Sequence, residues 1–216
     1  MPRPKLAWDC ATGNGQAARG IARYFERVIA TDASAGQIAH AMPVSNVEYR
    51  VAPAESSGLD AGTVDLVTVA QALHWLNHDR FYAEVRRVAR QDAVIAAWCY
   101  GHCHAGADVE TLLRDFEEGT VGAYWHPERK WVIDNYRTIP FPFDEVTPPS
   151  LELRVRWSLS QLGEYISSWS AVAGYRRERG HDPVPALLER IALRWGSPDQ
   201  RREVTWPMGM RVGRVG

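Results

Sequence analysis

The sequence of 216 residues lacks the features that mark membrane-bound, secreted or nucleic-acid-binding proteins. No apolar run approaches the ~20 residues of a membrane-spanning helix, and the N-terminus has no apolar segment typical of a secretory signal. The formal net charge of -1 leaves no overall field that would attract nucleic acid or an anionic membrane. We therefore predict no nucleic-acid partner and no membrane partner.

Cysteine is also scarce. The three cysteines, Cys10, Cys99 and Cys103, form no CxxC pair, and their odd number does not indicate a disulfide framework. Reduced thiols of this kind are typical of a cytoplasmic protein. The run His102, Cys103, His104 matches no zinc-ligand spacing, so we predict no metal site.

Apolar residues make up 45% of the chain, which is enough to bury one substantial core. In the first hundred residues short apolar runs alternate with helical periods. Strands are predicted at 6–11, 28–32, 46–52, 64–73 and 92–100, with helices from Gln16, at 34–42 and at 79–90. This alternation predicts an α/β fold with a doubly wound, Rossmann-like and mostly parallel sheet.

After residue 100 the pattern changes to aromatic, proline-rich and more irregular sequence. Predicted elements are a helix at 108–121, an irregular stretch at 123–150, a strand at 151–159, helices at 160–180 and 183–196, and a strand at 202–215. We expect a seven-stranded sheet with an antiparallel C-terminal strand and a helical, aromatic insertion after strand five. In this division 1–100 is the Rossmann-like half, 101–150 a substrate-side insertion, and 151–216 a strand pair and helices that complete the same domain.

The stretch WDCATGNGQAA lies where the first predicted strand meets the first helix. Glycines at such a place let a ligand approach the bare backbone closely. Gly13, Gly15 and Ala18 satisfy the dinucleotide pattern GxGxxG/A. The alternation of Asp9, Ala11, Gly13 and Gly15 is instead typical of the loop that holds S-adenosylmethionine. The sequence thus leaves two ligand classes open, and a plain turn is the third interpretation.

Asp9 favours the methyl donor over the dinucleotide. A carboxylate just before the loop repels a pyrophosphate but attracts the ammonium and sulfonium groups of S-adenosylmethionine. Asp32, at the end of the second predicted strand, suits either ligand because it can hold ribose hydroxyls. An NAD(P)-dependent oxidoreductase is therefore the alternative that the glycine pattern supports.

Four segments carry a resemblance to the class I S-adenosylmethionine-dependent methyltransferases of type 11. They are DCATGNGQ at 9–16, ATDAS at 30–34, VAPAE at 51–55 and the run at 64–90. More narrowly, the chain resembles the branch that includes trans-aconitate methyltransferase and related small-molecule enzymes, strongly in its first half and more loosely in its second. The resemblance implies an enzyme, a monomer or homodimer, that uses S-adenosyl-L-methionine to methylate a small molecule.

The resemblance also implies a set of cofactor contacts. It places the loop beside the methionine portion, Asp32 at the ribose and Gln71 below the cofactor. The implied cofactor-binding residues are Asp9, Ala11, Thr12, Gly13, Asn14, Gly15, Asp32, Ala33, Ala54, Glu55, Gln71 and Ala72.

Methyl transfer needs no obligatory acid–base pair, because the cofactor supplies the reactive group. A carboxylate acceptor, the leading interpretation, calls for an arginine such as Arg137 to orient it. A hydroxyl acceptor calls for a base, and His74, which follows the fourth predicted strand, is the candidate. The residues predicted to bind the acceptor are His74, Trp75, Tyr100, His102, Trp125, Arg137 and Trp169. Aromatic members of this set are equally compatible with a core of large side chains.

The chain departs from the family at its start. Family members carry helices before the first strand that cover the cofactor, whereas here that strand begins by about Lys5. We therefore expect an open cofactor site or a chain truncated at its start. A non-catalytic or impaired cofactor-binding module is the corresponding alternative function.

Overall fold

The structure is a computed structural model that describes residues 4–197 and 199–216, and these residues form two compact units. The first unit comprises the chain up to Tyr100 with Asp134–Ser150 and Gly209–Gly216, and the second comprises Gly101–Ile133 and Leu151–Met208. Within the described residues, no helix has both the length and the apolar character needed to cross a membrane.

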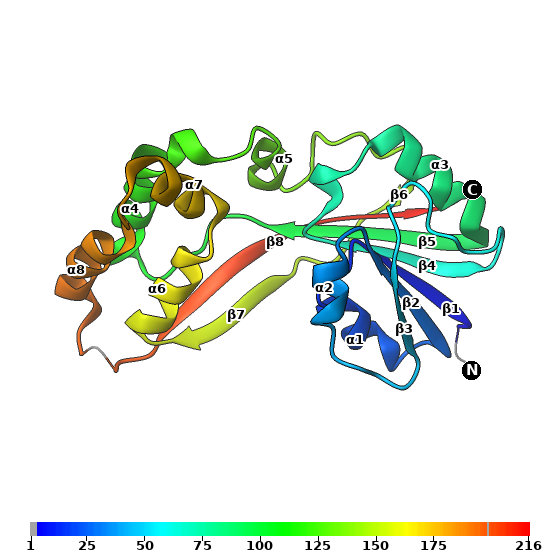
Figure 1. Ribbon diagram of the computed structural model, residues 1–216, viewed down its shortest axis with the longest axis horizontal. Helices are drawn as coiled ribbons and strands as arrows, with labels where there is room; N and C mark the ends of the chain where they lie inside the picture. The colour runs from blue at the N-terminus through cyan, green and yellow to red at the C-terminus, as the bar shows by residue number, and fades with distance from the viewer. Residues whose placement is uncertain (1–3, 198) are drawn as a thin grey trace. The chain divides into compact units, whose positions relative to one another are not determined.

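The first unit is built on a mostly parallel sheet (Figure 1). Its strands, in the order β3-β2-β1-β4-β5-β8-β6, confirm the predicted doubly wound fold and its antiparallel C-terminal strand. The bounds are β1 (Leu6–Cys10), β2 (Arg27–Asp32), β3 (Val47–Val51), β4 (Val64–Ala70), β5 (Ala89–Tyr100), β6 (Asp144–Val146) and β8 (Arg202–Arg214). The sequence analysis missed β6, which lies in the stretch that we expected to be irregular.

Helices cover both faces of this sheet, so that β1 is buried on both sides. Ala7 packs in one apolar cluster with Ala18 and Ala22 of α1 (Gln16–Ala22). The next residue, Trp8, points to the opposite face, where its ring lies 6.0 Å from that of Phe81 on α3 (His78–Val88). A short helix, α2 (Ala35–Ala39), begins after Ser34, whose side chain accepts a hydrogen bond from the Gln37 N–H. The chain thus passes through a helix between β1 and β2, between β2 and β3, and between β4 and β5, whereas β3 is joined to β4 by a loop.

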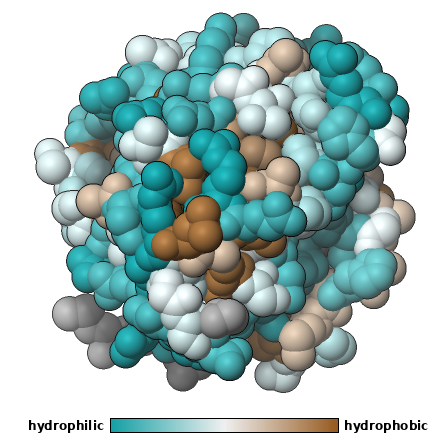
Figure 2. Space-filling view, turned by 90° about the vertical axis from the view of Figure 1, so that its left-hand side faces the viewer, coloured by the Kyte–Doolittle hydropathy of each residue, from teal (hydrophilic) through white to brown (hydrophobic). Residues whose placement is uncertain are grey.

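The second unit combines helices with a strand pair. Its elements are α4 (Ala107–Arg114), a π-helical turn η2 (Asp115–Thr120), a short 3-10 turn η3 (Gly122–Tyr124), α5 (Arg129–Ile133), β7 (Glu152–Trp157), α6 (Leu159–Ser167), α7 (Ser170–Arg179) and α8 (Val184–Trp195). Strand β7 pairs antiparallel with the first part of β8. The face of the molecule shown in Figure 2 is mostly hydrophilic, with a small apolar area near its centre.

The single helix predicted at 160–180 was wrong, because the chain leaves helical geometry between α6 and α7. Trp169 is extended there, with φ -64° and ψ 135°. Its ring packs against the rings of Phe116, Trp125 and Tyr165. This aromatic packing lies between segments distant in sequence, so the local helical period does not reveal the break.

Candidate functional site

The loop between β1 and α1 owes its small residues to its backbone conformation. Ala11, Gly13 and Gly15 all have positive φ, at 52°, 57° and 84°. This left-handed region is open to glycine and strained for a residue with a Cβ. At Gly15 a Cβ would also lie 2.5 Å from the Tyr49 hydroxyl oxygen. The alternating pattern therefore reflects a backbone that turns left-handed at every second residue.

Replacing Ala11 by glycine is expected to stabilise the protein by about 0.5–1 kcal/mol. The left-handed conformation costs a residue with a Cβ about 1–2 kcal/mol, which exceeds the 0.5–1 kcal/mol of extra entropy that a glycine loses on folding. Urea denaturation measures the change. The matched control is Ala83→Gly at an exposed position of α3, which should lower the free energy of unfolding by about 1 kcal/mol. A loss of stability at both positions would contradict strain at Ala11.

Asp9 lies beneath this loop and is completely buried. Its two carboxylate oxygens accept hydrogen bonds from the hydroxyls of Thr12, at 2.5 Å, and Thr68, at 2.6 Å. Burial raises the pKa of Asp9 to about 6, the two threonine hydrogen bonds lower it, and the charge of Asp32 adds a smaller upward shift. Asp9 therefore supports the loop from inside the protein and does not line the pocket described below.

Asp32, at the end of β2, is the carboxylate at the surface of the site. Its Oδ2 accepts a hydrogen bond from the Gly13 N–H at 2.9 Å, and its Oδ1 accepts one from the Ser34 N–H at 2.8 Å. The bond from Gly13 ties the loop to the second strand. A carboxylate oxygen has two acceptor sites, so both oxygens can still accept a further bond from a ligand.

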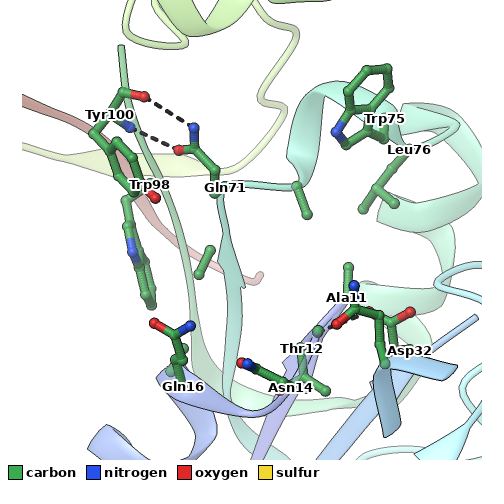
Figure 3. A pocket seen from close by; sticks show the side chains of 15 residues that line it. Ala11, Thr12, Asn14, Gln16, Asp32, Gln71, Trp75, Leu76, Trp98 and Tyr100 are labelled. Carbon is green, nitrogen blue, oxygen red and sulfur yellow. Dashed lines mark hydrogen bonds between the residues drawn. The ribbon is translucent and has the colours of Figure 1, made fainter. Parts of the chain in front are cut away.

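The opposite side of the site is formed where β4 and β5 end. Gln71 has a φ of 55°, and its N–H donates to the Trp98 carbonyl at 2.8 Å. Its side-chain amide bonds twice to the backbone of Tyr100, donating to the carbonyl at 3.0 Å and accepting from the N–H at 2.8 Å (Figure 3). The amide side chain thereby continues the pairing of the two strands beyond the end of β4.

Together these segments enclose a pocket of about 750 Å³. In Figure 3, Trp98 and Tyr100 stand on one side, and Trp75 and Leu76 on the other. The lining residues are Ala11, Thr12, Gly13, Asn14, Gln16, Ala17, Asp32, Gln37, Ala70, Gln71, Ala72, Trp75, Leu76, Trp98 and Tyr100. Nine of these were predicted from the sequence, seven as cofactor contacts and two as acceptor contacts.

Five predicted cofactor contacts lie outside this lining: Asp9, Gly15, Ala33, Ala54 and Glu55. Ala54 is buried, whereas Ala33 is exposed. The Glu55 carboxylate accepts a hydrogen bond from the Asn77 N–H at 3.4 Å. Their contacts with a cofactor stay a prediction.

The predicted acceptor residues are divided among several places. His74 is buried, and its Nδ1 lies 2.8 Å from the hydroxyl oxygen of Tyr136, away from the pocket lining. Arg137 is largely exposed and pairs with Asp134 at 2.9 Å. Neither residue belongs to the lining of this pocket, and their contacts with an acceptor stay a prediction.

A second cavity, of about 340 Å³, lies within the second unit and contains two further predicted acceptor residues. It is lined by His102, Glu117, Glu118, Gly122, Trp125, Arg129 and Ile133. Trp169 is not part of this lining but packs against Trp125, with 5.6 Å between ring centroids. In the described part of the chain, no three His, Cys, Asp or Glu side chains are grouped to hold a metal ion.

The sequence analysis missed six lining residues of the first pocket: Gln16, Ala17, Gln37, Ala70, Leu76 and Trp98. Trp98 could have been found, because it lies two residues before Tyr100 on one strand and so on the same face. Gln37 carries no comparable signal, since its place depends on how α2 packs.

Comparisons with known proteins agree with this geometry. A family model described as a methyltransferase domain matches residues 8–97. A Dictyostelium discoideum protein provisionally assigned as a methyltransferase is 36% identical over 197 residues, covering 90% of this chain and 75% of that protein. Saccharomyces cerevisiae CRG1, provisionally assigned as an S-adenosylmethionine-dependent methyltransferase, is 25% identical over 210 residues, covering 81% and 72%. A solved structure from Anaeromyxobacter dehalogenans, provisionally assigned as a type II methyltransferase, has a TM-score of 0.92 and 42% identity, covering 99% of this chain and 91% of that one.

Proposed function

Because this chain belongs to the class I S-adenosylmethionine-dependent methyltransferases, we propose that its loop pocket binds S-adenosylmethionine and that the enzyme methylates an oxygen of a small molecule. The bound cofactor supplies an activated methyl group on a sulfonium. The protein then has to hold the cofactor and bring an acceptor atom into line with that methyl group.

The charge of the pocket lining is the observation that supports this cofactor most directly. Of the described residues that line the pocket, one is acidic, Asp32, and none is Arg, Lys or His. A pyrophosphate would find no basic side chain in this lining to neutralise its charge, whereas a ligand that carries a sulfonium and an ammonium needs none. The absence of basic side chains from this lining supports the methyl donor in place of the argument from Asp9, which is buried and does not line the pocket.

The residues present fit the parts of S-adenosylmethionine. The Asp32 carboxylate can accept hydrogen bonds from the ribose hydroxyls, and the small residues of the loop let the ligand approach the backbone. Trp98 and Tyr100 offer aromatic faces of the kind that attract a sulfonium. A volume of about 750 Å³ lies within the usual range for a small-molecule site.

The acceptor is the second half of the proposal. A carboxylate acceptor depended on Arg137 as its clamp, and that side chain is exposed and paired with Asp134. A hydroxyl acceptor needs a base and no such clamp. We therefore favour a hydroxyl oxygen of a small molecule as the atom that receives the methyl group.

Thermal unfolding with S-adenosylhomocysteine, NAD or NADP tests the cofactor. S-Adenosylhomocysteine at 100 times its dissociation constant should add about 2.7 kcal/mol to the free energy of unfolding, which raises the unfolding midpoint by several degrees. NAD and NADP should leave it unchanged, because the lining offers no basic partner for a pyrophosphate. Stabilisation by a dinucleotide alone would overturn the proposal, and no response to any of the three would favour an impaired module.

A further inference from the structure

The second cavity contains a cluster of charged and aromatic side chains that the cofactor does not explain. Its centre is Glu117, a carboxylate that is only 6% exposed and lies in the π-helical turn η2. π-Helical turns are frequent at functional sites. One oxygen of Glu117 lies 2.7 Å from Nδ1 of His102, and the other is paired with the Arg129 guanidinium. The cluster is therefore held by one buried acid between a histidine and an arginine.

This pairing determines which nitrogen of the His102 ring carries the hydrogen. An ionised carboxylate can only accept, so Nδ1 of His102 must carry the hydrogen that it donates to Glu117. Burial and the charge of Arg129 lower the pKa of His102, while the charges of Glu118 and Glu110 act in the opposite direction. In the neutral ring the second nitrogen, Nε2, is then an acceptor, on a side chain that lines the cavity.

Arg129 complements this acceptor with donors. Its guanidinium carbon lies 3.7 Å from the centre of the Trp125 ring, and the indole N–H of Trp125 donates to the Glu117 backbone carbonyl at 3.1 Å. Burial lowers the pKa of Arg129 to about 10, which keeps the group protonated at neutral pH. A guanidinium has five N–H groups, more than the contact with Glu117 uses. The cavity thus presents an acceptor nitrogen, N–H donors and an aromatic and aliphatic wall.

A hydroxyl group on an aromatic ring matches this arrangement. It donates one hydrogen bond and accepts others, and its ring suits a wall that includes Trp125 and Ile133. A carboxylate acceptor would match less well, because an ionised carboxylate has no hydrogen to donate to Nε2 of His102. In the sequence, only Gly101 stands between Tyr100, which lines the loop pocket, and His102.

We infer that the second cavity binds a phenolic methyl acceptor and that His102, oriented by Glu117, is the base that removes its hydroxyl proton. The inference rests on the proposed function and extends it to a substrate class. The proton moves from the phenol oxygen to His102 Nε2, and the oxygen keeps the electron pair of the broken O–H bond. Glu117 stabilises the resulting imidazolium, and Arg129 donates to the phenolate. The phenolate is the nucleophile that methyl transfer to oxygen requires.

4-Nitrophenol tests this inference without any methyl donor, because its ionised form is coloured. Charged hydrogen bonds in the cavity should favour binding of the ionised form about tenfold. At one pH unit below the pKa of the probe, about a tenth of the free compound is ionised, and saturating protein should raise this to about half. Absorbance titration of the wild-type protein measures the change.

The variants His102→Gln and His104→Gln separate a specific base from general binding. His104 is a matched control, since its Nδ1 also contacts a glutamate, Glu110, at 3.0 Å, but it does not line the cavity. His102→Gln should abolish the increase in ionised probe, and His104→Gln should retain it. If His102→Gln does not fold, the ring ¹⁵N signals of His102 in the wild-type protein should instead show Nε2 becoming protonated as 4-nitrophenol is added.

The inference would be overturned by the absence of saturable 4-nitrophenol binding to the wild-type protein, or by the same increase in ionised probe in His102→Gln as in His104→Gln. An unchanged Nε2 signal on saturation would do so as well. Titration with S-adenosylhomocysteine in parallel keeps the two proposals apart. If S-adenosylhomocysteine does not bind, the proposed cofactor is contradicted. If it binds normally but 4-nitrophenol gives a negative result, only the proposed acceptor is contradicted.

Discussion

Asp32→Ala is expected to weaken the binding of S-adenosylhomocysteine by about 100-fold, because hydrogen bonds to a charged carboxylate contribute about 1.5–3 kcal/mol each. Two effects combine. The variant removes the proposed acceptor for the ribose hydroxyls, and it removes the partner of the Gly13 N–H, which holds the loop against β2. Isothermal titration calorimetry of the folded variant measures the loss.

Asp65→Ala is the matched control for this experiment. Asp65 also accepts two backbone N–H bonds, from Lys5 at 2.8 Å and Leu6 at 2.9 Å, and it pairs with Arg90. It lies near the start of β4, whereas the pocket residues Ala70 and Gln71 lie at the end of that strand. Its removal should lower stability and leave the affinity for S-adenosylhomocysteine within about threefold of the wild-type value. Equal losses of affinity in the two variants would contradict a direct role for Asp32.

Asp9→Asn is expected to remove a loss of stability of about 3 kcal/mol that the wild-type protein undergoes as the pH rises. This loss arises because burial raises the pKa of Asp9 from 3.8 to about 6. Below about pH 4 the carboxyl is protonated in both the folded and the unfolded chain. Between about pH 4 and 6 the unfolded chain releases the proton while the folded chain keeps it, so this group lowers stability as the pH rises. Above about pH 6 that loss is complete.

Asparagine removes this titration and can keep the hydrogen bonds. Its amide oxygen can accept from one of the two threonine hydroxyls, and its NH₂ group can donate to the other. The free energy of unfolding of the variant, minus that of the wild-type protein, should therefore rise by about 3 kcal/mol between pH 4 and pH 7. Urea denaturation across this range measures the difference. A difference that stays constant with pH would show that Asp9 is not protonated in the folded protein near pH 5.

Two other residues make the pH experiment specific. The pKa of Glu84 is lowered to about 2, mainly by its hydrogen bonds to Arg87, and this contribution to stability is lost as the pH falls below about 4.5. Because Glu84 is present in both the wild-type protein and Asp9→Asn, its contribution cancels in the difference between their free energies of unfolding. Thr68→Val deletes a donor to Asp9 and should extend the window of falling stability to higher pH.

The sequence was sufficient to predict the first five strands because their apolar periods are local. It was also sufficient to predict the loop, since left-handed backbone selects small residues at Ala11, Gly13 and Gly15. The role of Asp9 could not be predicted in the same way. Thr68, its partner, is 59 residues away and becomes a neighbour only through the parallel register of β1 and β4. Local sequence shows an acid at the end of a strand and does not show that it is buried and bonded.

The same limit applies to His74, which was predicted to face the acceptor. Its position after β4 was located correctly, but its partner Tyr136 is 62 residues away, in a segment that we expected to be irregular. For His102, the sequence predicted a contact with substrate but not the partner of the side chain. The bond of His102 to Glu117 depends on the π-helical turn that follows α4, which the helical period alone does not indicate.

The two hydrogen bonds between the Gln71 side chain and the Tyr100 backbone have a consequence for ligand selection. One wall of the loop pocket behaves as part of the sheet instead of as a mobile loop, because an amide side chain takes the place of a backbone partner there. A ligand that packs against Trp98 and Tyr100 then needs little conformational entropy to order that wall. Affinity at this side of the pocket should accordingly depend on shape, and a ligand of the wrong outline meets a surface that does not adapt.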